Sequence, residues 1–310
     1  MAQYAFLFPG QGSQVVGMGK ELYEESSVAR KLYDHADAVL ERPLSKMCVE
    51  GPAEDLQNTA NTQPALYVTS CAAFETLREK GFEPTAVAGH SLGEYSALYA
   101  GGVFDFETGL KLVEVRGRAM GCAGEDAPGG MAAVIGLDIA KIDEICEAVS
   151  AEDGLVVVAN DNSPGQTVIS GEKEALEAAC ERLKEAGAKR AMTLPVSGAF
   201  HSPLMQEAQL QLASQLAESA LHTPTCPFYP NVKAELANDV DTIRKCLVDQ
   251  VIGRVRWVET MELMIKAGMG QALEVGPGKV LAGLMRRIDK SVKVLPAGSL
   301  EDIEALEQDA

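Results

Sequence analysis

The pentapeptide Gly89-His90-Ser91-Leu92-Gly93 is the most restrictive local pattern in the chain. It follows an apolar run at residues 84–89 that predicts a short buried strand, and it precedes a helical pattern at residues 94–101. In such a strand-turn-helix setting the glycines permit a sharp turn from which the serine side chain points outward. The pattern predicts an α/β fold with Ser91 as a candidate nucleophile, and a purely structural glycine turn is the alternative interpretation.

Residues 126–196 differ from the segments on either side in the order of their predicted strands and helices. Their patterns predict, in order, a strand, a helix, two strands, a helix and a strand. This order is typical of a ferredoxin-like split βαβ unit, which can fold as a self-contained body. We therefore predict a larger α/β domain formed by residues 1–125 and 197–310, with residues 126–196 inserted as an α+β subdomain.

The charge balance restricts the partners of the chain. With 27 basic and 45 acidic residues the formal net charge is −18, which argues against a broad nucleic-acid-binding face. No apolar stretch is long enough to span a membrane, and the N-terminal apolar run stops at Pro9 without a basic region before it. The seven cysteines are widely spaced, which is typical of buried thiols in a reducing compartment. We expect a cytoplasmic protein that acts as a monomer.

A serine nucleophile needs a base, and the chain has only four histidines. His35 lies in a charged helical stretch, and His222 precedes Thr-Pro near a helix end, so both are expected at the surface. His90 is adjacent to Ser91, where neighbouring side chains diverge, which favours a packing or orienting role. His201 lies in a loop before a capped helix and remains the candidate base.

Short motifs are spread over nearly the whole chain. They are Gly10-Gln11-Gly12-Ser13-Gln14, Gln63-Pro64-Ala65-Leu66, Gly89-His90-Ser91-Leu92-Gly93-Glu94-Tyr95, Arg116-Gly117-Arg118, Asn160-Asp161-Asn162-Ser163-Pro164, Gly198-Ala199-Phe200-His201-Ser202 and Glu274-Val275-Gly276-Pro277-Gly278. In this order they resemble the motifs of bacterial malonyl-CoA:acyl carrier protein transacylases. The resemblance implies a hydrolase-like three-layer α/β core with a parallel sheet, and an inserted ferredoxin-like α+β subdomain.

The resemblance also implies a reaction. Malonyl would pass from malonyl-CoA to the phosphopantetheine thiol of acyl carrier protein through a malonyl-serine intermediate on Ser91, in a ping-pong sequence. His201 would be the general base and then the general acid, oriented by the main-chain carbonyl of Gln250. The N–H groups of Gln11 and Leu92 would bind the oxyanion.

Further positions of the chain match substrate-binding residues of the family. Arg116 would pair with the malonyl carboxylate through its planar guanidinium, although taken alone it could be a surface charge. Phe200 would limit the space at the α-carbon and so favour malonyl over methylmalonyl. Gln63, Asn160 and Asn162 match pocket residues of the family.

The chain departs from the family in one place. Many relatives have proline immediately before Val-Arg-Trp, where this chain has Gly253-Arg254. The looser backbone weakens the prediction for the neighbouring Gln250 carbonyl.

Two other classes of function share some of these features. A serine esterase or thioesterase would use the same elbow with a carboxylate behind the histidine, and Asp126, Asp138 and Asp153 lie between Ser91 and His201. A non-catalytic scaffold that binds carrier protein would keep the fold, but retention of both Ser91 and His201 argues against it. No cofactor or metal is expected, because no ligand spacing is present.

Both expected substrates, CoA thioester and carrier protein, are anionic, so local basic patches are expected on an acidic chain. Residues 279–293 contain five basic residues and one acidic residue. The candidate docking residues are Lys279, Arg286, Arg287 and Lys290 in one patch, and Lys184, Lys189 and Arg190 in a second. We expect these patches to flank the mouth of the cleft.

Overall fold

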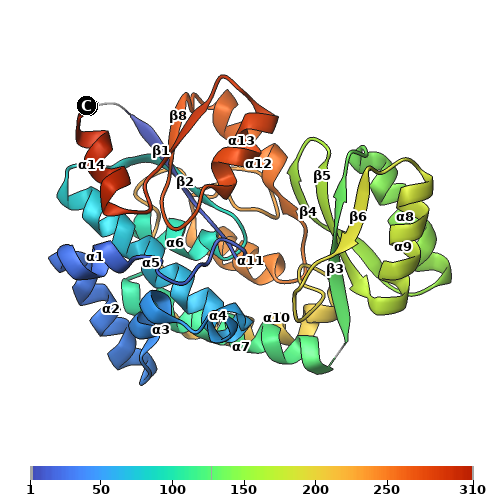
Figure 1. Ribbon diagram of the computed structural model, residues 1–310, viewed down its shortest axis with the longest axis horizontal. Helices are drawn as coiled ribbons and strands as arrows, with labels where there is room; N and C mark the ends of the chain where they lie inside the picture. The colour runs from blue at the N-terminus through green and yellow to red at the C-terminus, as the bar shows by residue number, and fades with distance from the viewer. Residues whose placement is uncertain (1–2, 127, 309–310) are drawn as a thin grey trace.

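The computed structural model describes residues 3–126 and 128–308, and its larger part is built on a parallel sheet (Figure 1). The strands are β2 (Pro84–Gly89), β1 (Tyr4–Phe8), β8 (Gln271–Glu274) and β9 (Lys293–Pro296), in the order β2-β1-β8-β9. In β1, Phe6 and Phe8 join one hydrophobic cluster while Ala5 and Leu7 join another. Both faces of the sheet are therefore buried, as expected for a parallel sheet.

Helices cover both faces of this sheet. The cluster that contains Phe6 receives residues from α1 (Lys20–Glu25), α2 (Ser27–Leu40), α3 (Leu44–Glu50), α4 (Ala53–Gln57), α5 (Thr59–Glu79), α6 (Gly93–Ala100), α7 (Phe106–Asp126), α10 (Gln206–Glu218), α11 (Val240–Gln250) and α14 (Leu300–Gln308). The opposite cluster is formed with α12 (Trp257–Lys266) and α13 (Val280–Ile288). The predicted three-layer α/β core is thus confirmed.

A smaller α+β unit lies at one end of the molecule (Figure 1). Its elements are β3 (Gly129–Ile135), α8 (Ile139–Glu152), β4 (Val156–Ser163), β5 (Gln166–Glu172), α9 (Lys173–Glu185) and β6 (Arg190–Thr193). The strands β6-β3-β5-β4 form the antiparallel order of a ferredoxin-like sheet. Residue 127, beside the predicted junction of residues 125 and 126, lies outside the described residues.

The small sheet has a fifth strand that the sequence did not predict. β7 (Val255–Arg256) comes from the larger domain and pairs in parallel with β4. It covers the edge of β4, whose N–H and C=O groups need partners. The edge of the small sheet is therefore completed by a strand of the larger domain.

Two prolines occupy different places in their helices. Pro64 lies inside α5 and not in its first turn, because Asn58 caps that helix and accepts a hydrogen bond from the Ala60 amide. Proline leaves the Ala60 carbonyl without its usual helical donor, and Arg42 Nη2 donates to it at 3.5 Å. Pro203 begins a short 3-10 helix (Pro203–Met205), with Ser202 as its cap, before α10.

Candidate active site

Ser91 occupies a sharp turn at the carboxyl end of β2. Its φ is 52°, in the left-handed region that a side chain other than glycine seldom adopts. A Cβ on Gly89 would lie 1.9 Å from the Gly93 carbonyl carbon, and one on Gly93 would lie 2.1 Å from the Phe8 oxygen. Because other backbone atoms approach so closely, both positions require glycine. The sharp turn between them presents the Ser91 side chain at the carboxyl end of β2.

Two residues outside the predicted set hold this turn. Asn231 accepts a hydrogen bond from the Ser91 amide at 2.7 Å and donates to the Gly89 carbonyl at 2.8 Å. Glu94, fully buried in α6, accepts from the Asn231 amide and from Gln250 Nε2. The sequence carried a signal for Glu94, an acid within an otherwise apolar helix, whereas Asn231 lies in a loop without a recognisable pattern.

His201 contacts the Ser91 hydroxyl directly. The distance from His201 Nε2 to Ser91 Oγ is 2.8 Å, and Nδ1 lies 2.8 Å from the Gln250 carbonyl and 3.2 Å from that of Gly253. Because carbonyls only accept, Nδ1 carries the proton and Nε2 is free to accept from the serine. The φ of His201 is also left-handed, at 58°.

The surroundings of His201 keep its ring neutral. Burial, together with the nearby positive charge of Arg116, lowers the pKa of His201 to about 3. An unprotonated imidazole beside a serine hydroxyl can act as a base.

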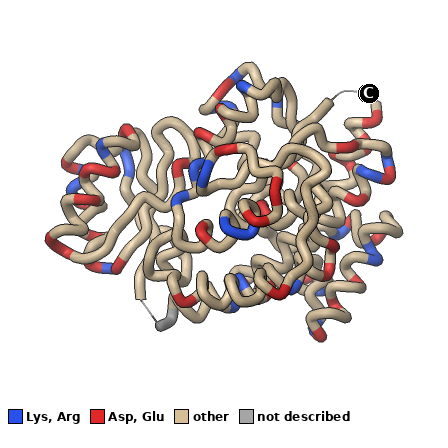
Figure 2. Tube along the Cα trace, turned by 180° about the vertical axis from the view of Figure 1, so that it is seen from behind, with Lys and Arg blue, Asp and Glu red and all other residues tan. Residues whose placement is uncertain are grey.

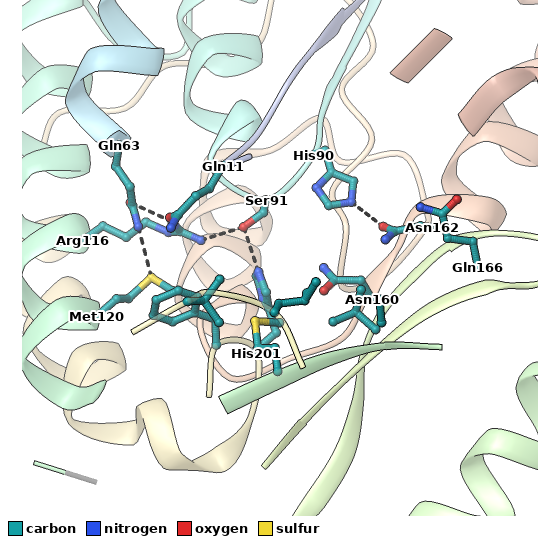
Figure 3. Close-up of a pocket in the computed structure, with 16 residues that line it drawn as sticks. Gln11, Gln63, His90, Ser91, Arg116, Met120, Asn160, Asn162, Gln166 and His201 are labelled. Carbon is teal, nitrogen blue, oxygen red and sulfur yellow. Dashed lines mark hydrogen bonds between the residues drawn. The ribbon is translucent and has the colours of Figure 1, made fainter. Parts of the chain in front are cut away.

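Arg116 is 1% exposed and points at the nucleophile from α7 (Figure 3). Its Nη2 donates to Ser91 Oγ at 3.1 Å and to Gln250 Oε1 at 2.8 Å, and its Nη1 donates to Gln63 Oε1 at 2.7 Å. Within residues 3–126 and 128–308 no carboxylate pairs with it, and its Nε has no hydrogen-bond partner. A buried cation held by neutral acceptors favours an anionic ligand next to Ser91.

A cavity of about 290 Å³ lies over Ser91, between the larger domain and the small sheet. One face of the small sheet packs on α8 and α9, and the other forms the wall of the cavity. The cavity is lined by Gln11, Gln63, His90, Ser91, Arg116, Met120, Met131, Ala133, Asn160, Asn162, Gln166, Val168, Leu194, Val196, Phe200 and His201. All predicted substrate-binding residues are therefore brought together in one place (Figure 3).

The turn at Gly10 packs against the serine turn. A Cβ on Gly10 would lie 2.3 Å from the His90 carbonyl oxygen, so only glycine allows this approach. Among the described residues, the amides of Gln11 and Leu92 have no hydrogen-bond acceptor. Both N–H groups are free to bind an oxygen atom beside Ser91.

The remaining histidines lie apart from the reacting atoms. His90 is hydrogen-bonded through Nε2 to Asn162 Oδ1 at 2.7 Å, and burial lowers its pKa. His35 pairs with Glu107 at an exposed position. His222 lies in the loop after α10.

The acids considered for a hydrolase triad do not support one. Asp138 caps α8 and Asp153 pairs with Arg182, while the side chain of Asp126 lies outside the described residues. In the described part of the chain, no group of three or more His, Cys, Asp or Glu is arranged to hold a metal ion. No described helix is both long and apolar enough to cross a membrane.

Comparison with known proteins identifies the family. The acyl transferase domain family matches residues 5–299. This chain belongs to that family. It is 43% identical over 304 residues to the malonyl CoA-acyl carrier protein transacylase of Bacillus subtilis, covering 98% of this chain and 96% of the relative. It is 44% identical over 307 residues to the enzyme of that name from Escherichia coli K12, covering 99% and 98%.

Solved structures of other members have the same fold. A malonyl-transacylase in complex with a type II PKS acyl-carrier protein superposes with a TM-score of 0.96 at 41% identity, covering all of both chains. An acyl-carrier-protein S-malonyltransferase from Bartonella henselae superposes with a TM-score of 0.95 at 46% identity, covering 99% of each chain. The resemblance inferred from the motifs of this acyl transferase is thereby confirmed.

The neutral state of His201 makes stability depend on pH. The unfolded chain binds a proton at this ring below its ordinary pKa of 6.5, whereas the folded acyl transferase does so only near pH 3. Acidification across this range therefore lowers the free energy of unfolding. Relative to His201→Gln, we expect the wild type to lose roughly 2 kcal/mol more between pH 7 and pH 5 in urea titrations. Equal losses in the two proteins would mean that the folded ring is already protonated at pH 5.

Proposed function

We propose that this acyl transferase moves malonyl from malonyl-CoA to the phosphopantetheine thiol of acyl carrier protein. The observation that carries the proposal is the buried Arg116 guanidinium, which pairs with no carboxylate of the described residues and touches the hydroxyl of a serine–histidine pair. Malonyl provides both groups that this arrangement requires, a thioester carbonyl for the serine and a carboxylate for the arginine.

In the first half-reaction Ser91 Oγ attacks the thioester carbonyl while His201 Nε2 takes the hydroxyl proton. The oxyanion is bound by the N–H groups of Gln11 and Leu92. Collapse breaks the carbon–sulfur bond, and His201 returns the proton to the CoA thiolate. In the second half-reaction the phosphopantetheine thiol attacks malonyl-Ser91, and the same groups act in reverse. The main-chain carbonyl of Gln250 holds the imidazole throughout.

The substrate contacts follow from the cavity lining. Arg116 pairs with the malonyl carboxylate, and Gln63 fixes the guanidinium from behind. Phe200 limits the space at the α-carbon, which disfavours a methyl group there. Asn160 and Asn162 bind polar groups of the acyl donor from the wall of the small sheet.

The direct test is acyl transfer with malonyl-, methylmalonyl- and acetyl-CoA, each with and without purified carrier protein. We expect malonyl-carrier protein as the main product and little free malonate when the acceptor is absent. Rapid malonate release without acceptor would instead support a hydrolase, and absence of both products in folded protein would support a scaffold. The carbonyl partners of His201 favour the transferase, since the hydrolases considered use a carboxylate.

Carrier protein docks, in this proposal, on the basic patch of α13. Acidic residues are distributed over both parts of the molecule (Figure 2), while Arg286, Arg287 and Lys290 line one surface hollow. The start of α13 adjoins the segment that follows the Gly10 turn, because a Cβ on Gly278 would lie 3.5 Å from Ser13 Cβ, and Arg286 and Arg287 lie in the last turn of the same helix. In the second patch, Lys189 and Arg190 lie at the edge strand β6, whereas Lys184 lies on α9, behind the wall of the cavity. The patch on α13, which includes Lys279, is therefore the better placed.

Reversing charge in this patch should weaken carrier-protein binding. The double variant Arg286→Glu and Arg287→Glu is expected to raise KM for carrier protein about tenfold at low salt, and less at high salt because ions screen the attraction. Lys20→Glu with Lys46→Glu makes the same change in net charge on α1 and α3 and is expected to leave KM unchanged. Equal effects of the two double variants on KM would mean that the patch acts only through the net charge of the protein and is not a docking site.

We propose that the enzyme is a monomer and that it acts in the cytoplasm. All seven cysteines are free thiols, and Cys122 is exposed where a buried position was expected. A free exposed thiol is typical of a reducing compartment.

A further inference from the structure

Residues 250–256, which connect α11 to α12, contact both parts of the molecule. The Gln250 and Gly253 carbonyls accept from His201 Nδ1, and the Gln250 side chain accepts from Arg116. At its other end this segment forms β7 along β4, and the Arg256 amide donates to the Asn231 carbonyl at 3.0 Å. The orientation of the His201 ring therefore depends on how the segment is held.

Arg254 fixes the middle of this segment to the small subdomain. Its two terminal nitrogens bind the two carboxylate oxygens of Asp143 on α8, and its Nε donates to the Val158 carbonyl at 3.4 Å. Among the described residues, this is the one ion pair that joins the small subdomain to the larger domain. Both side chains are about one-third exposed, at 33% and 34%, so solvent screens the attraction between their charges. The pair acts mainly by fixing the positions of the two segments relative to each other.

We propose that Arg254 is a positioning residue that couples the small subdomain to the His201 ring. Arg254 follows directly after Gly253, so the bidentate pair with Asp143 holds the Gly253 carbonyl against His201 Nδ1. The bond from Arg254 Nε to the Val158 carbonyl also attaches the segment to β4, which carries Asn160 and Asn162 in the wall of the cavity. Released from Asp143, the segment and the cavity wall shift relative to Ser91, and a displacement near 1 Å can cost up to about 100-fold in rate.

The proposal rests on the transacylase function, and the test separates the two. Malonyl transfer by the wild type tests the function itself. The ratio of kcat/KM in each variant to kcat/KM in the wild type tests the role of Arg254. We expect Arg254→Ala and Asp143→Ala each to lower kcat/KM for malonyl-CoA about 10- to 100-fold. The double variant should lose no more than Arg254→Ala alone, because Asp143→Ala removes only the ion pair, which Arg254→Ala removes together with the bond to the Val158 carbonyl.

Arg182→Ala is the matched control. Arg182 pairs with Glu152 and Asp153 at similar exposure, but entirely within the small subdomain. Its removal is expected to leave kcat/KM within about twofold of the wild type, as for surface pairs generally. A loss as large as that of Arg254→Ala would show that any weakening of the subdomain has this effect, and would overturn the proposal.

A second measurement reports on His201 itself. The hydrogen-bonded Nδ1 proton should give a downfield NMR signal that Arg254→Ala shifts or broadens by solvent exchange, and Arg182→Ala leaves in place. Asp143→Asn, which removes the charge and one of the two acceptor oxygens but keeps the shape of the side chain, provides a milder variant that keeps the test valid if the alanine variants unfold. Wild-type kcat/KM in Arg254→Ala, an unchanged Nδ1 signal, or additive losses in the double variant would each contradict the proposal.

Discussion

Replacing Ser91 with alanine is expected to lower malonyl transfer to carrier protein by at least about 10⁴-fold. The hydroxyl is the atom that His201 Nε2 contacts at 2.8 Å, and no other described nucleophile touches that ring. Intact-mass measurement after incubation with malonyl-CoA should show one added malonyl group on the wild type and none on Ser91→Ala.

The backbone contacts of position 91 provide the control for this experiment. The Ser91 amide binds Asn231 and the Ser91 carbonyl accepts from Gln250 Nε2 at 2.9 Å, and alanine preserves both bonds. The urea midpoint of the variant should therefore stay close to that of the wild type. A malonyl group found on folded Ser91→Ala would place the nucleophile elsewhere, and peptide mapping would locate it.

Replacing Arg116 with alanine should alter substrate choice more than any other change in the cavity. The malonyl carboxylate loses its guanidinium partner, so kcat/KM for malonyl-CoA is expected to fall about 10³- to 10⁴-fold. Acetyl-CoA has no carboxylate to pair, and its slow transfer should change by less than about tenfold. Parallel assays with the two donors measure this difference.

Arg116→Lys separates charge from shape. Lysine keeps the positive charge, but it lacks the fork that reaches Gln63, Gln250 and Ser91 at the same time. We expect activity toward malonyl-CoA between that of the wild type and Arg116→Ala. If Arg116→Ala lost equal activity toward both donors, the arginine would act on the serine and not on the carboxylate.

The sequence was sufficient for features whose physical cause is local. Gly89 is required by its close contact with Gly93 in the same turn, and Phe6 and Ala5 alternate between two buried faces within one strand. Each of these patterns involves residues that are only a few positions apart in the sequence. They predicted the serine turn and an α/β fold, whereas the parallel sheet and the family were inferred from motifs spread over nearly the whole chain.

Features that depend on distant partners could not be predicted in this way. Asn231 contacts Ser91 across 140 positions of the chain, and no local pattern distinguishes it from other loop asparagines. A strand as short as β7 has no periodicity, and it exists because β4 offers an edge.

The sheet order β2-β1-β8-β9 has a consequence for synthesis of the chain. β1, which precedes every other described strand, is an inner strand, and its second neighbour, β8, begins only at Gln271. Until then one edge of β1 remains uncovered, with Phe6 and Leu7 in an apolar strand of the kind that pairs with other chains. Contacts this far apart in sequence also slow folding. During synthesis, β1 is therefore a strand at which the chain can pair with other chains until β8 has been added.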